Sequence, residues 1–568
     1  MTRRAFLLGL IALLIVAAAG RALLLASGSV SFHSDEAVVA LMARHILDGA
    51  RPVFFYGQAY MGSLDAWLIA AGFALFGESV HTIRLVQSAL YLLIVATGAL
   101  AAYRLTGRAA LALIAGLLLA VPNTLVALYT TATLGGYNET LLLGNLILLV
   151  GIDAVRALRA EEASRTDAPL GVPTNRHVVR WAALGLLAGL GCWTNGLIIA
   201  YVVPVGLLLI VRVFRLRIPA ARLIAPALAA AIAFFVGSAP WWIFNLNNDF
   251  AALRFYLPGG TPEQFAGGDV PALDTSQRLI GLFLLGLPAV LGLRYPWSPA
   301  YFTPDALTLI LAFAVLGITL AGLYLLARGG GVWNPRRRGA LPADARALLL
   351  IAIGFFILLF LVSRFSTDPT GRYFLPLIVY LAILVAGFVM SLPRVWMRTA
   401  AVGLVLVYGT LGLAAAVRNT PPGVTTQFNL DTNLPNDDDA ALIAFLEENG
   451  LVHGYTNYWI AFRIAFLSEE RLQYRSALPY KSDLSYTPRD DRYTPYVTAV
   501  DAAAANGEGV AYVTANIAEV RAWLESWFAE QRVTYTYASV GMYHIYYDFA
   551  PRAPVPPERF AGILVPGQ

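Results

Sequence analysis

Repeated apolar runs of about 20 residues constrain this chain more than any other feature of its sequence. Runs of that length are typical of helices that cross a bilayer. Only 13% of the residues are charged and 58% are hydrophobic, whereas soluble domains carry about 25% charged residues. The expected fold class is therefore mainly α, a polytopic membrane helical bundle. We predict about eleven spans, near residues 5–27, 82–103, 109–127, 139–155, 181–199, 200–214, 222–240, 304–327, 346–363, 373–391 and 399–416.

The distribution of arginine predicts how the chain is oriented. Arg3 and Arg4 precede the first run, and further arginines gather in alternate loops, as in cytoplasmic segments. We therefore expect a multi-pass protein of the plasma or inner membrane with a cytoplasmic N-terminus. An odd number of spans then places residues 417–568 outside. Because the basic residues lie in these short loops, the net charge of +5 does not indicate a nucleic-acid partner.

The apolar run of residues 279–293 is the weak point of the span count. It is about 15 residues long and contains Pro288, so it is short for a full crossing. We interpret it as a re-entrant or interfacial segment within a long outer loop. If it did cross the membrane, the C-terminal region would lie in the cytoplasm.

The composition changes after Arg418, where Pro421-Pro422-Gly423 reads as a linker. We predict two domains, a transmembrane domain of residues 1–416 and a soluble extracytoplasmic α/β domain of residues 417–568, large enough for a core of its own. The second domain is expected to hold a helix around Ala441–Leu446, a strand at Gly509–Thr514, an amphipathic helix at Ala518–Gln531, and strands at Val533–Tyr537 and Tyr543–Tyr547.

The first outer loop, residues 28–81, holds an adjacent acid pair directly after the first span. Asp35 and Glu36 follow His33 and precede a helical pattern that ends in an aromatic, glycine-rich segment. Such a pair can simply be solvated. The loop is too long for a plain connector, however, and a carboxylate at this boundary could take a proton from an acceptor as a lipid-linked sugar is attacked. Asp35 and Glu36 are therefore the predicted catalytic residues, and His33 is a substrate-binding candidate.

The second outer loop ends in Tyr137, Asn138 and Glu139, at the start of an apolar span. One interpretation of Glu139 is a helix N-terminal acid that complements the macrodipole. The other is a second carboxylate that faces the site of Asp35 and binds a divalent cation or a sugar hydroxyl. Tyr137, Asn138 and Glu139 are thus substrate-binding candidates. Asp35 and Glu139 are candidates for metal ligands.

Arginines on the predicted outer side run against the inside bias of the chain. Arg364 and Arg372 flank a loop before the span at 373–391, and Tyr373 follows. They are either interfacial arginines whose charged ends reach the lipid surface, or ligands for the phosphate of a polyprenyl lipid. We expect Arg364, Arg372 and Tyr373 to contact substrate.

Two further outer boundary segments contain Asn195, Trp241 and Asn245. Tryptophans at such positions usually form an interfacial belt, but these three residues could also line a sugar pocket. His33 and His45 are possible metal ligands, although the sequence contains no complete ligand cluster. The single cysteine, Cys192, excludes an intramolecular disulfide and a metal site built from several cysteines.

The order of these features resembles the GT-C glycosyltransferases, in particular the dolichyl-phosphate-mannose protein mannosyltransferases and the bacterial aminoarabinose lipid A transferases. Three segments carry the resemblance: Ser34-Asp35-Glu36-Ala37, Gly136-Tyr137-Asn138-Glu139 and Gly371-Arg372-Tyr373-Phe374-Leu375-Pro376. It covers residues 1–416. It implies a GT-C fold, a polyprenyl-phosphate sugar as donor, Asp35 as base and Arg372 near the lipid phosphate.

This chain departs from those relatives after the juxtamembrane helix. They often have prolines and a basic residue there, whereas this chain has Tyr56–Asp65. Gln58, Tyr60 and Asp65 are candidates for contacts to the donor.

The predicted function is an inverting membrane glycosyltransferase that moves a sugar from a polyprenyl phosphate to an extracytoplasmic lipid, glycan or protein. The sequence leaves open whether a divalent metal cation serves as a cofactor. The alternatives are a transporter or flippase of a lipid-linked sugar, and a scaffold whose C-terminal domain engages the cell wall. Transporters tend to carry charges at the membrane midplane, whereas this chain places its acids at the outer boundary.

Overall fold

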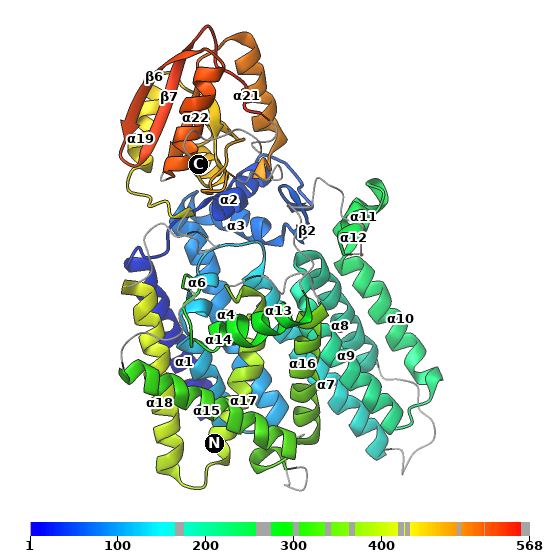
Figure 1. Cartoon of the computed structure of the whole chain (residues 1–568). Coiled ribbons are helices and arrows are strands. Elements are labelled where there is room, and N and C mark those ends of the chain that lie inside the picture. Colours follow the sequence, from blue (N-terminus) through cyan, green and yellow to red (C-terminus); the bar gives the residue numbers. More distant parts are fainter. Residues whose placement is uncertain are drawn as a thin grey trace.

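The computed structural model describes residues 2–164, 175–256, 274–298, 306–334, 342–362, 368, 370–418, 425, 432–484, 490–515 and 517–557. Long helices form a bundle, and a smaller α/β unit lies at one end of it (Figure 1). The N-terminus lies at the opposite end of the bundle from this unit.

A helix stands at each predicted span position: α1 (Arg3–Ala26), α4 (Val80–Thr106), α5 (Ala109–Ala120), α7 (Tyr137–Ser164), α8 (Asn175–Thr194), α9 (Ile199–Arg215), α10 (Ala220–Gly237), α15 (Ala306–Arg328), α16 (Pro342–Val362), α17 (Leu377–Ser391) and α18 (Val395–Arg418). Among the described residues, eight helices are long and apolar enough to cross a membrane. The chain is therefore a multi-pass membrane protein. Because α5, α8 and α17 are not among the eight, the count of eleven spans stays a prediction.

A helical segment lies across the long helices rather than along them (Figure 1). It consists of α13 (Thr275–Ile280), a π-helical stretch (Gly281–Gly286) and α14 (Leu287–Val290), and it includes most of the short apolar run. Gly371 packs directly on it, since a Cβ there would lie 2.6 Å from the Cβ of Ala289. With φ of +85°, this position suits glycine alone. The transverse segment thus seats the loop that carries Arg372.

The first outer loop folds into α2 (Ser34–Leu47), a hairpin of β1 (Phe54–Phe55) and β2 (Gln58–Gly62), and α3 (Leu64–Phe76). The predicted juxtamembrane helix is confirmed as α2. The aromatic segment makes the hairpin, in which Phe55 pairs with Gln58 around a turn at Gly57. Three short helices complete this end of the membrane part: α6 (Thr124–Tyr129), α11 (Ala239–Asn247) and α12 (Ala251–Tyr256).

The C-terminal unit is built on a five-stranded sheet of order β4-β3-β5-β7-β6. Strand β3 is parallel to β4 and β5, whereas β7 is antiparallel to β5 and β6. The strands are β3 (His453–Thr456), β4 (Gln473–Ser476), β5 (Val510–Ala515), β6 (Thr534–Val540) and β7 (Tyr543–Ala550). The helices are α19 (Asp439–Glu448), α20 (Tyr458–Leu467), α21 (Thr494–Asn506) and α22 (Ala518–Glu530).

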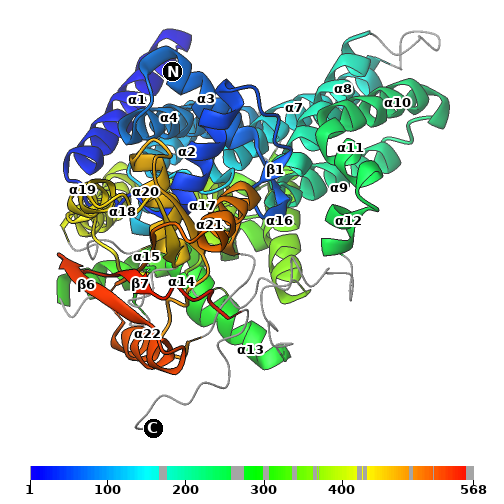
Figure 2. The ribbon, with the colours of Figure 1, turned by 90° about the horizontal axis from the view of Figure 1, so that it is seen from above.

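Two hydrophobic cores serve the C-terminal unit. One is its own and gathers Tyr512, Trp523 and Phe528 between the sheet and α22. The other is shared with the first outer loop, because α20 is buried on all sides and packs on α2. Seen from above, α20 lies beside α2 (Figure 2). Since each fully buried large apolar side chain contributes about 1.5–3 kcal/mol, the unit is docked firmly rather than tethered.

Candidate active site

The two acids in the first turn of α2 face different surroundings. Successive residues of a helix point about 100° apart, so two neighbouring side chains can face different surroundings. Glu36 turns inward and is fully buried, with its carboxylate 2.7 Å from the guanidinium of Arg84 on α4. The backbone N–H of Thr133 donates to it at 3.3 Å. The carboxylate of Asp35 remains partly accessible, at 21% exposure of its side chain.

Asp35 meets two side chains from the C-terminal unit. The hydroxyl of Tyr458 donates to Asp35 Oδ1 at 2.5 Å, and Arg492 Nη2 lies 3.5 Å from the same oxygen. The guanidinium of Arg492 lies over the rings of Tyr458 and Phe55, at 4.3 and 5.1 Å from their centres. Asp35 is therefore enclosed by residues that are distant in sequence.

Gln58 and Tyr60 extend the site along the hairpin. With its amide oriented to satisfy both neighbours, Gln58 donates to Tyr60 Oη at 3.0 Å and accepts from Arg492 at 3.1 and 3.3 Å. Burial would lower the pKa of Arg492, but Tyr458, Asp35, Asp490 and Tyr60 outweigh this effect and raise it. Arg492 thus keeps its positive charge.

Burial also acts on the two residues that flank Asp35. It lowers the pKa of His33 to about 4, although the charge of Asp35 partly opposes the shift. His33 is therefore neutral near pH 7, with its ring edge-on to Trp459. Burial raises the pKa of Glu36 to about 7, against the opposing charge of Arg84. The residue that stays accessible between them is Asp35.

Asp65, Asn138 and Glu139 come together inside the protein. Asp65 accepts hydrogen bonds from Gln87 at 3.0 Å, from the hydroxyl of Thr133, and from the backbone N–H groups of Gly135 and Gly136 at 3.2 and 3.3 Å. Asn138 donates to Gln87 at 2.6 Å, and Glu139 lies beside Asp65. All three acids and amides are at most 2% exposed. This network joins α3, α4 and the start of α7, and Thr133 links it to Glu36.

Arg372 lies in a pocket of tyrosines on the other side of Tyr60. Its guanidinium forms an ion pair with Asp368 at 2.6 Å and lies 5.0 Å from the ring centre of Tyr373. Tyr129 and Tyr137 are close enough to interact with its charge. Tyr60 is near both Tyr373 and Arg492, so it stands between the two arginines. Arg364 lies outside the described residues.

Asn195, Trp241 and Asn245 are buried and serve the backbone or the core. Asn195 donates to the carbonyl of Gly135 at 3.3 Å and accepts from the N–H of Leu197 at 3.0 Å. Trp241 belongs to a cluster with Phe54 of the hairpin. Asn245 donates to the carbonyl of Trp241 at 2.8 Å and accepts from Leu253 at 2.9 Å. A role in sugar binding stays a prediction for all three.

Candidate metal ligands do not gather into a complete site in the described part of the chain, where no three His, Cys, Asp or Glu side chains form a group able to hold an ion. His45 is engaged with Glu470, at 3.0 and 3.1 Å, and with Tyr56 at 3.0 Å. Asp35 is held by a phenol and a guanidinium, and Glu139 lies beside Asp65. These residues supply too few metal-ligating atoms for any chemistry to be assigned to a metal ion.

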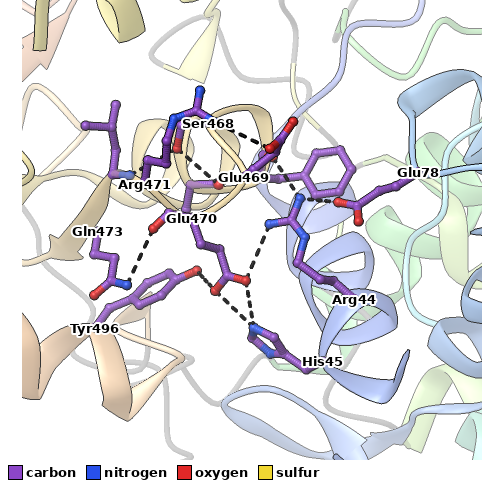
Figure 3. Close-up of polar contacts among 12 residues, drawn as sticks. Arg44, His45, Glu78, Ser468, Glu469, Glu470, Arg471, Gln473 and Tyr496 are labelled. Carbon is purple, nitrogen blue, oxygen red and sulfur yellow. Dashed lines mark hydrogen bonds and ion pairs between the residues drawn. The ribbon is translucent and has the colours of Figure 1, made fainter. Parts of the chain in front are cut away.

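A second polar contact joins the far end of α2 to the C-terminal unit (Figure 3). Glu470 accepts from His45, from Arg44 at 3.4 Å and from the hydroxyl of Tyr496 at 2.5 Å. Burial would raise the pKa of Glu470, but the hydrogen bonds of His45 and Tyr496 and the charges of His45 and Arg44 lower it to about 2. Arg44 also pairs with Glu78. We call this cluster the Glu470 contact.

Sequence reasoning missed three residues of the site: Arg84, Tyr458 and Arg492. A signal existed for Arg84, because a charge at the start of an apolar span needs a partner. No such signal marked Tyr458, which begins a helix without a polar face, or Arg492, which follows a segment without periodicity. Their proximity to Asp35 arises only from the docking of the C-terminal unit.

Comparisons with known proteins address the fold. No protein-family model matches the chain, and no curated protein sequence does either. Solved structures do match. The crystal structure of ArnT from Cupriavidus metallidurans bound to undecaprenyl phosphate is 15% identical, with a TM-score of 0.58 over 98% of this chain and 100% of that one. The apo state of the same protein gives 14% identity and a TM-score of 0.57, over 95% and 98% of the two chains.

The apo oligosaccharyltransferase from Archaeoglobus fulgidus also aligns, at 12% identity and a TM-score of 0.49, over 90% of this chain and 70% of that one. The likeness to ArnT extends over both the helical bundle and the C-terminal unit. The resemblance carried by the three short motifs is thereby confirmed at the level of architecture. This chain has the fold of ArnT.

Proposed function

We propose that this chain is a membrane glycosyltransferase that moves a sugar from a polyprenyl-phosphate donor to an extracytoplasmic acceptor, with Asp35 as the general base. One observation carries the proposal. Of the four acids Asp35, Glu36, Asp65 and Glu139, the last three are at most 2% exposed, whereas the Asp35 side chain is 21% exposed. Asp35 is thus the acid that a substrate can reach.

The chemistry of sugar transfer fits this placement. An acceptor hydroxyl gives its proton to the Asp35 carboxylate while its oxygen bonds to the anomeric carbon. The bond from that carbon to the phosphate oxygen breaks, and polyprenyl phosphate leaves with the electron pair. Attack from the side opposite the leaving phosphate inverts the anomeric centre. Because the candidate ligands form no complete set, no step is routed through a metal.

Arg372 is the proposed contact for the leaving phosphate. A guanidinium fork suits phosphate oxygens, and the Arg372 side chain is 26% exposed. ArnT, which has this fold, was crystallised with undecaprenyl phosphate. In this chain a phosphate would compete with Asp368 for Arg372. Glu36 then acts through Arg84 to hold α2, rather than on the substrate.

The orientation follows the same proposal. The active site and the C-terminal unit lie at the end of the bundle opposite the N-terminus (Figure 1). With Arg3 and Arg4 retained in the cytoplasm, this end faces the outside, where polyprenyl-linked sugars meet acceptors of the cell envelope.

The test begins with the donor. Mass spectrometry of envelope lipids and glycoproteins after deletion of the gene identifies the sugar that is lost. Purified enzyme is then assayed with that donor. Asp35→Asn should reduce turnover by about 10²–10⁴-fold, the range that a general base contributes. Asp501→Asn, on the exposed side of α21, is the matched control and should retain activity. Full turnover by Asp35→Asn would contradict the proposal.

A further inference from the structure

We infer that Arg492 and Tyr458 of the C-terminal unit are positioning residues for Asp35, so that the catalytic site is complete only when this unit is docked on α2. The inference rests on the proposed function and deepens it, because it assigns a role to a region outside the three family-like motifs. It is carried by the contacts of Arg492, the burial of its side chain, and the shape of the hairpin beneath it.

Arg492 is held on every side that the structure describes. Its side chain is 8% exposed and lies between the rings of Phe55 and Tyr458, with the Gln58 amide at one edge and Asp35 at another. A cation enclosed this way by aromatic faces and carboxylates has few alternative positions. Its burial also favours an ionised Asp35, because a buried guanidinium needs a counter-charge.

The hairpin has space for this arginine because of one glycine. At Gly57 a Cβ would lie 2.8 Å from Cγ of Arg492 and 3.2 Å from its Cα. Gly57 also has φ of +72°, which side chains rarely tolerate. The turn of the first outer loop and the Arg492 segment of the C-terminal unit therefore fit each other closely, although they are far apart in sequence.

Tyr458 fixes Asp35 from the neighbouring side. Its hydroxyl donates to the same oxygen, Oδ1, that Arg492 approaches. Tyr458 is the first residue of α20, the helix that shares a core with α2, so its ring is 2% exposed and has little freedom. Two groups of the C-terminal unit, Tyr458 and Arg492, thus converge on one oxygen of Asp35 and fix the orientation of its carboxylate.

The position of Arg492 also separates its role from that of Arg372. In an inverting displacement the base and the leaving phosphate lie on opposite sides of the anomeric carbon. Arg492 contacts the base, so it lies on the acceptor side. Arg372 lies beyond Tyr60, where it pairs with Asp368. Loss of Arg492 should therefore change turnover more than donor affinity.

The experiment compares Arg492→Met with Arg492→Lys in the full-length enzyme, with Glu470→Gln as the control. Glu470 belongs to the contact at the other end of α2, so this variant weakens that contact while the unit stays docked, and it does not touch Asp35. We expect Arg492→Met to lower kcat by about ten-fold or more, the effect of one lost charged contact, and to leave the donor KM within about two-fold. Arg492→Lys should recover part of kcat, and Glu470→Gln should keep it.

The pH dependence gives a readout that a purely structural role would not change. Arg492, Tyr458 and His33 are among the titratable groups that interact with Asp35, and the charge of Asp490 acts on both Arg492 and Tyr458. Without the neighbouring cation the carboxylate is protonated more easily, so the acidic limb of the kcat profile should move to higher pH in Arg492→Met. Unchanged kcat and an unchanged limb would overturn the inference, as would equal losses of activity in Arg492→Met and Glu470→Gln.

The two proposals fail in different ways. If Asp35→Asn is inactive while Arg492→Met behaves as the wild type, the proposed function stands and the positioning role is wrong. If Asp35→Asn retains full turnover, the base itself is wrong, whatever Arg492→Met shows.

Discussion

The two ends of α2 both meet the C-terminal unit through an acid and an arginine, yet they differ in which partner supplies the acid: α2 supplies Asp35 at the near end, and the C-terminal unit supplies Glu470 at the far end. At the far end, Glu470 accepts hydrogen bonds from His45, Arg44 and Tyr496 (Figure 3). At the near end, Asp35 Oδ1 has a phenol at 2.5 Å and a guanidinium at 3.5 Å, and its side chain is 21% exposed, close to the 20% of Glu470. Exposure therefore does not separate the two acids. On the proposal above, the acid on α2 does the chemistry, whereas the acid on the C-terminal unit joins the two regions.

The largest expected effect comes from the buried ion pair between Arg84 and Glu36, the residue next to Asp35 in α2. Arg84→Met leaves Glu36 buried without its counter-charge, and removal of one partner of a buried pair costs about 3–5 kcal/mol. The loss of stability should be greatest above pH 7 and smaller at lower pH. The pKa of Glu36 is already about 7 in the folded protein, against an ordinary 4.5. At lower pH the folded state therefore binds a proton at Glu36 that the unfolded state does not bind, and this removes the unpaired charge.

Thermal unfolding of Arg84→Met in detergent, scanned from pH 8.5 to pH 5.5, measures this effect. Arg471→Met is a suitable control, because Arg471 pairs with Glu447 and Glu469 on the surface of the C-terminal unit with 56% of its side chain exposed. If the fall in melting temperature of Arg84→Met did not depend on pH, the Glu36 carboxylate would not set the stability of this end of α2.

A smaller effect is expected for Tyr458→Phe. The variant keeps the ring that packs between α2 and Arg492 but removes the hydrogen bond to Asp35. A hydrogen bond to a charged group is worth about 1.5–3 kcal/mol, so its loss at the proposed base should lower kcat by about ten-fold or more. Because Glu470→Gln weakens hydrogen bonds to three partners, the melting temperature should fall less in Tyr458→Phe than in that variant. Steady-state kinetics with the native donor measures it. A fall in melting temperature without a fall in kcat would make the near end a structural contact like the far one.

The opposite pattern is expected for Glu470→Gln. This change weakens the hydrogen bonds of the Glu470 contact, so it should lower the free energy of unfolding by about 1–2 kcal/mol. Turnover at a permissive temperature should stay close to that of the wild type. Melting curves and initial rates measured on the same preparation check both parts. Loss of turnover at full stability would remove the distinction between the two ends.

The smallest expected effect is a change in the stability contributed by Glu470 at acidic pH. The pKa of Glu470 falls from 4.5 in its ordinary state to about 2 in the folded protein, so its stabilising contribution is present above pH 4.5. It is lost progressively as the pH falls toward 2. The difference in melting temperature between wild type and Glu470→Gln should therefore shrink between about pH 4.5 and pH 3. A difference that stays constant across this range would show that the carboxylate charge contributes nothing.

Much of the fold could be predicted because apolar length and periodicity are local properties. The span positions, α2, β5 and α22 follow from patterns that lie within about 25 residues. Helix α20 was missed because it is apolar on every face, as befits a helix wedged between α2 and a sheet. Strands β3 and β4 were missed because four residues are too few for a reliable alternation.

The candidate site was predictable only in part, for a related reason. The sequence marked Asp35 and Glu36 together, and only the packing of α2 shows which of them faces inward toward Arg84. It also marked Asp65 and Glu139 as separate candidates, although they belong to one buried network. Arg492 and Tyr458 could not be assigned at all, since tertiary docking alone brings them to Asp35.

The docking of α20 has a consequence for biogenesis. Tyr458 follows Asp35 by 423 residues, and Arg492 comes later still. On the proposal above, a chain whose synthesis stops before that point would insert its helices into lipid yet stay inert toward the donor. Only a polypeptide whose synthesis has passed through the C-terminal unit would then be active, and incomplete copies would consume no lipid-linked sugar.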